Sequence, residues 1–344
     1  MKTHAIIPIF IPHLGCPNDC VFCNQKKITA RTKPLSMEEM KHQIEQYLAT
    51  MYGREIQTVE IAFYGGSFTG IPMEQQREFL SVAKEYKDRG LVQKIHLSTR
   101  PDYIDEAILS NLKKFGVDII ELGVQSLDED VLRRSRRGHS REAVFRASRL
   151  IQDAGFELGL QLMIGLPGDT YEKAVRSAWE AAEIGPSIAR IYPTVIIKDT
   201  ELHRMYLSGE YQPFSMEETI RTAKDMYQTL TEAGVNVIRV GLKSTDLIRE
   251  NGETAGSYHP AFRQVVESEL AREQLEAQLQ RLLASEAHPL KISFCSSEAC
   301  LSNLIGHKKS NKIYFEQKYP HLRFRFQSDR DLPEGVYSIR LQSD

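Results

Sequence analysis

Three of the five cysteines in this chain lie on one short segment, as Cys16, Cys20 and Cys23. Cysteines this close in sequence are poorly placed to pair with one another, whereas several thiolates on one loop can bind a metal centre together. Three thiolates leave one iron of a four-iron cluster without a protein ligand, so a nitrogen and oxygen chelate could bind there. The alternative is a structural zinc site with His13 as fourth ligand, although only one Cys-x-x-Cys pair is present.

Short apolar segments alternate with amphipathic stretches between residues 5 and 242, which is typical of repeated βα units. The segments are nearly continuously apolar, as expected of parallel strands buried on both faces. No Gly-x-Gly-x-x-Gly follows the first of them, which disfavours a dinucleotide-binding fold and favours a partial (βα)6 barrel of the α/β class. The predicted strands are residues 5–11, 58–63, 94–98, 117–124, 156–164 and 188–197, followed by 235–242.

Two helix starts are marked by a serine followed three residues later by a glutamate, Ser36 with Glu39 and Ser215 with Glu218. In this capping box the two side chains satisfy free backbone N–H groups reciprocally. The cysteines, the turn after residue 63 and the polar residues after the later strands would all lie at the carboxyl ends of the strands. We therefore expect the chemistry at that end of the barrel.

The pattern changes after residue 246, where a polar loop precedes a helical stripe of apolar residues between 260 and 287. The remaining residues predict a small α+β domain of strand, helix, basic turn, helix and two strands. The predicted domains are a barrel at 1–246, a linker with a bridging helix at 247–288, and an α+β domain at 289–344.

The Cys-x-x-x-Cys-x-x-Cys segment after the first strand, with Phe22 before its last cysteine, resembles the radical S-adenosylmethionine superfamily over about residues 1–242. The resemblance implies a [4Fe-4S] cluster whose open iron binds S-adenosylmethionine and whose electron splits it to methionine and a 5′-deoxyadenosyl radical. It also implies a reductant such as a flavodoxin or ferredoxin. The resemblance gives no residue a catalytic role other than binding the cluster or S-adenosylmethionine.

Further motifs resemble the branch of this superfamily that holds oxygen-independent coproporphyrinogen oxidases and the Elongator catalytic subunit. Two positions depart from it, because Ser98 and Gln161 stand where relatives often carry an acid. The segments at 99–103, 190–202 and 208–211 resemble the Elongator type more than the porphyrin type. The implied cofactor contacts are Phe22, Gly65, Gly66, Ser67, Ser98, Gln125, Arg137, Gln161 and Met163.

Elongator-type enzymes modify tRNA, so the resemblance implies tRNA as a substrate, although the tail after residue 246 is short for an acetyltransferase. A turn in this tail resembles the Gly-x-x-Gly loop of the KH module, with a lysine replacing the second glycine. Its candidate RNA-binding residues are Gly306, Lys308, Lys309 and Lys312. A porphyrin-like small molecule is the alternative substrate, and a non-catalytic zinc and RNA-binding module is the alternative to an enzyme.

Composition adds limits to these interpretations. The 344 residues carry 44 Lys and Arg against 46 Asp and Glu, which argues against capture of nucleic acid by overall charge. The few cysteines and the lack of an 18-residue apolar run predict a cytoplasmic protein without a membrane span. Cys295 and Cys300 are expected to be free thiols, and isolated histidines such as His139 are expected to be packed or surface residues and not catalysts.

Overall fold

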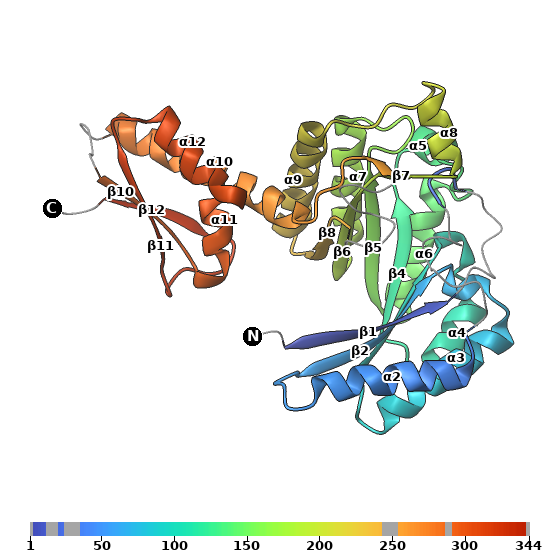
Figure 1. Ribbon diagram of the computed structural model, residues 1–344. Coiled ribbons are helices and arrows are strands. Elements are labelled where there is room, and N and C mark those ends of the chain that lie inside the picture. The colour runs from blue at the N-terminus through green and yellow to red at the C-terminus, as the bar shows by residue number, and fades with distance from the viewer. Residues whose placement is uncertain (1–2, 12–19, 24–34, 243–253, 286–290, 342–344) are drawn as a thin grey trace.

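The computed structural model describes residues 3–11, 20–23, 35–242, 254–285 and 291–341. Its larger sheet has seven parallel strands in the order β1-β2-β3-β4-β5-β6-β8, and it curls into a half-barrel (Figure 1). The predicted partial βα barrel is confirmed, with the predicted seventh strand at its edge. The strands are β1 (His4–Ile11), β2 (Thr58–Gly65), β3 (Lys94–Thr99), β4 (Ile119–Gln125), β5 (Glu157–Ile164), β6 (Ile188–Pro193) and β8 (Asn236–Val240).

Helices follow the strands and cover the convex face of this sheet (Figure 1). Both predicted capping boxes are present, at the first residues of α2 and α9. No helix in the described residues combines the length and apolarity that crossing a membrane requires. The covering helices are α2 (Met37–Met51), α3 (Met73–Asp88), α4 (Glu106–Lys114), α6 (Arg141–Asp153), α7 (Tyr171–Ile184) and α9 (Met216–Glu232). The short helices η1 (Phe68–Gly70), η2 (Pro101–Tyr103), α5 (Glu129–Arg134) and α8 (Glu201–Leu207) lie beyond the carboxyl ends of the strands.

Alternation along each strand separates the convex face from the concave one. On β1, Ile7 and Ile9 are fully buried, whereas Ile6 and Phe10 are 36% and 39% exposed. Successive side chains of a strand point to opposite faces, so the first pair packs against the helices and the second pair lines the inside of the half-barrel. The main apolar core therefore lies between the sheet and its helices.

The predicted strand at 188–197 is wrong in one respect, because the chain forms two strands there. β6 ends at Pro193, and β7 (Val195–Ile197) pairs antiparallel with β9 (Thr254–Gly256) in a separate two-stranded sheet. Proline has no backbone N–H to donate to a ladder, so the strand leaves the large sheet at this residue.

The C-terminal residues form a smaller unit with a three-stranded sheet in the order β11-β10-β12. β10 (Lys291–Ser296) is parallel to β11 (Arg323–Ser328) and antiparallel to β12 (Tyr337–Leu341). The predicted α+β character is confirmed. The helices of this unit are α10 (Phe262–Ser285), η3 (Glu298–Cys300), α11 (Leu301–Ile305), η4 (His307–Lys309) and α12 (Ser310–Lys318).

Helix α10 belongs to two apolar cores. Phe262 and Val266 in its first turns are buried in the core of the half-barrel. Ala271, Leu275 and Leu279, further along the helix, are fully buried in the core of the C-terminal unit. The helix therefore joins the two units by packing against both. The boundaries predicted at 246 and 288 stay a prediction.

Candidate active site

The described part of the cysteine loop, residues 20–23, lies beyond the carboxyl ends of the strands and is anchored to two rim helices. The backbone N–H of Val21 donates to Ser135 O at the end of α5, at 3.2 Å, and Leu202 N of α8 donates to Val21 O at 2.7 Å. Cys20 is buried and Cys23 is partly buried. The predicted ligand Cys16 and the alternative zinc ligand His13 lie outside the described residues.

Arg137 lies directly against this loop. Its Nη1 donates to Cys20 Sγ at 3.2 Å, and its Nη2 donates to the carbonyl oxygen of Gly123 at 2.5 Å. Its guanidinium also lies 6.0 Å from the ring centroid of Phe22. The Nε of Arg137 is buried and has no hydrogen-bond partner among the described residues. A buried donor of this kind is costly unless another group accepts its hydrogen bond.

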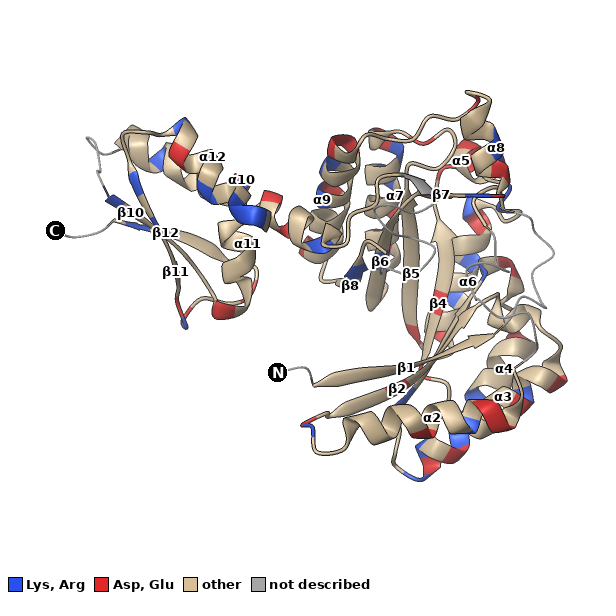
Figure 2. Ribbon diagram, viewed as in Figure 1, with Lys and Arg blue, Asp and Glu red and all other residues tan. Residues whose placement is uncertain are grey.

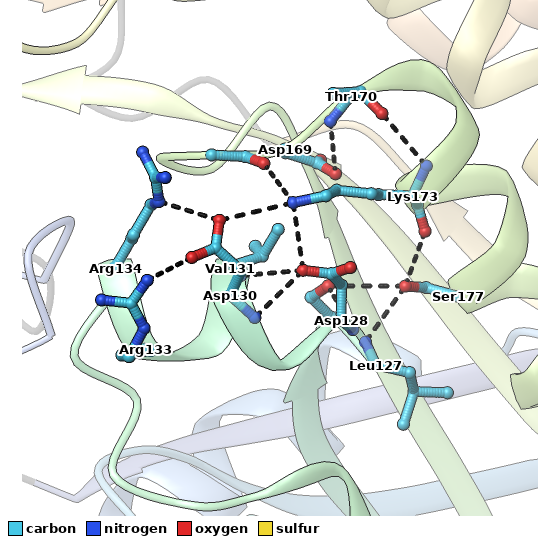
Figure 3. Close-up of polar contacts among 12 residues, drawn as sticks. Leu127, Asp128, Asp130, Val131, Arg133, Arg134, Asp169, Thr170, Lys173 and Ser177 are labelled. Atoms are coloured by element: carbon cyan, nitrogen blue, oxygen red, sulfur yellow. Dashed lines mark hydrogen bonds and ion pairs between the residues drawn. The ribbon is translucent and has the colours of Figure 1, made fainter.

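Helix α5, which leads to Arg137, is held in place by a network of charges (Figure 3). Asp128 caps its N-terminus by accepting from the backbone N–H groups of Asp130 and Val131. Lys173 of α7 lies 3.2 Å from Asp128 Oδ1 and donates to the carbonyl oxygen of Gly168 at 2.9 Å. The lysine therefore ties α5 to α7 and to the loop after β5.

A second arginine supports the backbone of Arg137. Arg100, at the end of β3, makes two 2.9 Å hydrogen bonds to the carboxylate of Asp102 and also donates to the carbonyl oxygen of Arg137. Paired hydrogen bonds of this geometry fix both partners in one orientation. Arg133, Arg134 and Arg136, by contrast, are exposed and paired with acidic residues at the surface.

The other residues expected to contact the cofactor come from the ends of β2, β3, β4 and β5. Gly65 is the last residue of β2 and has a positive φ of 111°, and Gly66 and Ser67 follow it in the turn. Gln161 Nε2 donates to Gln125 Oε1 at 3.2 Å. Gln125 itself has a φ of 69°, which is rare for a residue with a side chain and marks local strain.

Two further predicted residues lie at the same end of the concave face. Ser98 donates to Glu121 Oε1 at 3.0 Å, so a carboxylate from the neighbouring strand lies beside the position where relatives often have an acid. Met163, on β5, is partly buried. The structure thus places this set at one end of the half-barrel, and the roles of its members stay predictions.

Sequence reasoning missed a row of buried charges across the concave face. The carboxylate of Glu60 accepts from His96 Nδ1 at 2.7 Å and from His4 Nε2 at 3.1 Å. Beyond His96, Glu121 forms an ion pair with Arg190, with 2.7 Å between Nε and Oε2. Glu60, His96 and Glu121 are each 2% exposed or less and Arg190 is 8% exposed, so the row is shielded from solvent.

The electrostatics of this row stabilise the charged forms of Glu60 and Arg190. Burial would raise the pKa of Glu60, but the hydrogen bond and charge of His96 outweigh it, so the pKa lies below its ordinary value. Burial likewise opposes the charge of Arg190, yet Glu121 holds the pKa of this guanidinium above its usual range.

A signal for the row was present in the sequence. Each member is a single charged or imidazole residue inside an otherwise apolar strand, as in Val-Glu60-Ile, Ile-His96-Leu and Ile-Glu121-Leu. Such residues are seldom buried without partners, so several of them on neighbouring strands indicate a shared polar layer. In Figure 2 the strands of the large sheet are mostly uncharged and carry isolated red and blue segments.

The candidate RNA-binding turn lies in the C-terminal unit, between α11 and α12. Gly306 is buried with a φ of 86°, and a Cβ there would lie 2.6 Å from the backbone nitrogen of Asn311, so the helices approach too closely for a side chain. Lys308 and Lys309 are exposed, with φ values of 51° and 64°. The turn is thus a tight connection between helices that presents lysines to solvent. Cys295 and Cys300 are buried free thiols, as predicted.

His139 lies two residues beyond Arg137 and is buried, which is one of the two placements expected of an isolated histidine. Burial first, and the charge of Arg137 second, lower its pKa to about 4. The unfolded chain therefore binds more protons than the folded one between pH 6.5 and 4, and stability falls as the pH falls through this range.

We expect His139→Gln to reduce this acid sensitivity. The wild-type protein should lose about 2 kcal/mol more unfolding free energy than the variant between pH 7 and pH 4.5. Urea unfolding at the two pH values measures this difference. His42→Gln, at an exposed position of α2, is the matched control. An equal loss in the wild type and His139→Gln would contradict the prediction.

Comparison with known proteins agrees with this arrangement. Residues 10–178 match the Radical SAM superfamily, and residues 186–272 match the Radical_SAM C-terminal domain. A tRNA uridine(34) acetyltransferase of Methanocaldococcus infernus is 29% identical over 255 residues, which are 63% of this chain and 48% of the relative. Elongator complex protein 3 of Bos taurus is 30% identical over 260 residues, which are 63% of this chain and 47% of that protein.

The chain thus spans about half the length of the curated relatives it matches. Among solved structures, the archaeal Methanocaldococcus infernus Elp3 with an N-terminal deletion has a similar fold, with a TM-score of 0.63 and 22% identity. The similarity covers 80% of this chain and 64% of that one. Together with the cysteine loop and the half-barrel, the matches over 10–178 and 186–272 show that this chain belongs to the radical SAM superfamily.

Proposed function

We propose that this chain binds a [4Fe-4S] cluster through Cys16, Cys20 and Cys23, cleaves S-adenosylmethionine reductively and uses the resulting radical to modify tRNA. The observation that carries the proposal is the position of Arg137, with one nitrogen on Cys20 Sγ and a buried Nε that lacks a partner in the described residues. When bound, the cluster and S-adenosylmethionine supply an electron and a 5′-deoxyadenosyl radical.

The residues present suit this cofactor. A guanidinium matches a carboxylate through two parallel hydrogen bonds, so Arg137 would bind the carboxylate of S-adenosylmethionine next to the cluster loop. The turn at Gly65 and Gly66 lacks side chains and would let backbone groups approach the amine. The hydrogen-bonded pair of Gln125 and Gln161 would bind the ribose hydroxyls. Met163 would lie near the adenine.

The substrate class rests on the names of the relatives. One is a tRNA uridine(34) acetyltransferase, and the other is Elongator complex protein 3. Because this chain matches only about half of each, the same substrate is a proposal here. The exposed Lys308 and Lys309 would add phosphate contacts in the C-terminal unit, together with Lys312.

The test is anaerobic reconstitution of the full chain, followed by reduction in the presence of S-adenosylmethionine and total tRNA. We expect 5′-deoxyadenosine and a modified nucleoside after digestion of the tRNA, both measured by mass spectrometry. Formation of 5′-deoxyadenosine with no changed nucleoside would contradict the RNA assignment. Absence of iron and sulfide, with stoichiometric zinc instead, would contradict the whole proposal.

Gly123 offers a test of the role of Arg137. A Cβ at this position would lie 3.1 Å from Gln125 Nε2 and 3.4 Å from Arg137 Nη2. We expect Gly123→Ala to displace the guanidinium and weaken binding of S-adenosylmethionine about tenfold, the loss of roughly one charge-assisted hydrogen bond. Equilibrium dialysis with the reconstituted protein measures the affinity. Gly53→Ala, where a Cβ meets no atom within 4 Å, should leave the affinity unchanged.

A further inference from the structure

Arg190 forms hydrogen bonds with two tyrosines, Tyr64 and Tyr192, and neither has a role in the proposed binding of the cofactor. From β6 it reaches across the concave face to β2, where its Nη2 donates to the hydroxyl oxygen of Tyr64 at 2.6 Å. Its Nη1 donates to the hydroxyl oxygen of Tyr192 at 3.3 Å. Two phenols from strands far apart in the sheet therefore bind the two terminal nitrogens of one guanidinium.

The chemistry of these groups fixes the direction of the remaining hydrogen bonds. A guanidinium has donors and no acceptor, so both phenol oxygens accept from Arg190. Each phenol then has one O–H left to donate, and neither O–H has an acceptor among the described residues. Burial raises the pKa of Tyr64 to about 12 and raises that of Tyr192 as well, so both keep their protons at neutral pH.

Neighbouring side chains also hold the Tyr64 phenol in position. The ring of Tyr64 lies 6.2 Å from that of Phe10, and its contact with His96 is edge-on at 5.8 Å. Arg190 lies 5.0 Å from the centroid of the Tyr64 ring and is fixed on its other side by Glu121. Both tyrosines are nevertheless partly exposed, whereas the ion pair beneath them is buried. Donors that are fixed before binding lose little freedom when a ligand arrives.

We propose that Tyr64 and Tyr192 form a two-donor site that binds an acceptor oxygen of the substrate, either a carbonyl or a carboxylate oxygen. A uracil carbonyl is one such acceptor, so this inference rests on the proposed function and refines it. Arg190 and Glu121 are positioning residues for the two phenols. The carboxylate of S-adenosylmethionine has the same chemistry, but Arg137 at the cysteine loop is the donor expected for it.

The first experiment observes the phenols directly in the anaerobically reconstituted full chain. The protein is labelled with [¹³Cζ]tyrosine, and the two signals are assigned with Tyr64→Phe and Tyr192→Phe. Addition of uridine, or of sodium acetate as a simple carboxylate, should shift both signals, because ¹³Cζ responds to hydrogen bonding of the hydroxyl. Tyr52, which is 95% exposed, is the internal reference and should not shift.

Each outcome has one meaning. Shifts with uridine or acetate support the two-donor site, even if no tRNA nucleoside is changed by the wild-type protein, in which case the proposed function alone fails. No shift with either probe overturns the site, even if tRNA is modified. Shifts of both signals with S-adenosylmethionine alone would assign the phenols to the cofactor and overturn the substrate site.

The second experiment uses turnover of tRNA. Tyr64→Phe and Tyr192→Phe keep the rings and remove one donor each, so each should lower kcat/KM about 3- to 10-fold, the range for one hydrogen bond between neutral groups. Tyr52→Phe should leave kcat/KM unchanged. Unchanged kcat/KM in both single variants would overturn the inference.

Discussion

Cys23→Ala should abolish formation of 5′-deoxyadenosine while leaving the fold intact. The variant loses one of three thiolates proposed to hold the cluster, and an iron–sulfur cluster with two protein ligands on one loop is poorly retained. The fold should persist because the main apolar core lies between the sheet and its helices and includes none of the described residues 20–23 of the cysteine loop. Iron and sulfide content, mass spectrometry of 5′-deoxyadenosine and circular dichroism measure the three parts of this result.

The control for this experiment is Cys295→Ala, which removes a buried thiol from the C-terminal sheet. It should retain iron, sulfide and 5′-deoxyadenosine formation at wild-type levels. If Cys23→Ala kept full iron content and cleavage, the assignment of the cysteine loop as the cluster site would be wrong.

Arg190→Met should destabilise the protein by about 3–5 kcal/mol, the usual result of leaving one partner of a buried ion pair without compensation. Glu121 is 2% exposed, so the substitution leaves its carboxylate without the guanidinium at a buried position. The double variant Arg190→Met with Glu121→Gln should recover a large part of this loss, because it removes the uncompensated charge as well. Urea unfolding under anaerobic conditions measures all three proteins.

Arg204→Met is the comparison for a surface pair. Arg204 binds Glu201 and Glu210 on and beside α8, with its side chain 53% exposed, and such pairs contribute at most about 1 kcal/mol. A loss in Arg190→Met no larger than in Arg204→Met would show that the inner row is hydrated, contrary to the burial described above.

Most of the fold could be predicted because local and long-range signals agree. Continuous apolar segments predict the parallel strands, and the capping boxes predict where α2 and α9 begin. The split of the strand after residue 193 was not predicted, since β7 pairs with a segment about sixty residues later and such a partner leaves no local signal.

The candidate site was likewise predicted only in part. Arg137 was predicted as a cofactor contact because a motif places it, and the structure has its guanidinium against the cysteine loop, whereas the cofactor contact itself stays a prediction. The buried row from Glu60 to Arg190 was missed because its members lie on four strands, and only the curl of the sheet brings Arg190 to Tyr64. The sequence shows each charge singly, whereas their pairing depends on the three-dimensional arrangement.

The shared helix α10 determines the distance between the half-barrel and the C-terminal unit. Its 24 residues span about 36 Å at 1.5 Å per residue, and its two ends are packed into different cores. If an RNA bound the turn between α11 and α12, its reacting nucleotide would reach the cysteine loop only at a fixed number of phosphates from the bound nucleotide. The length of α10 would then select which nucleotide of the RNA reacts, and inserting or deleting one helical turn in it should change that nucleotide.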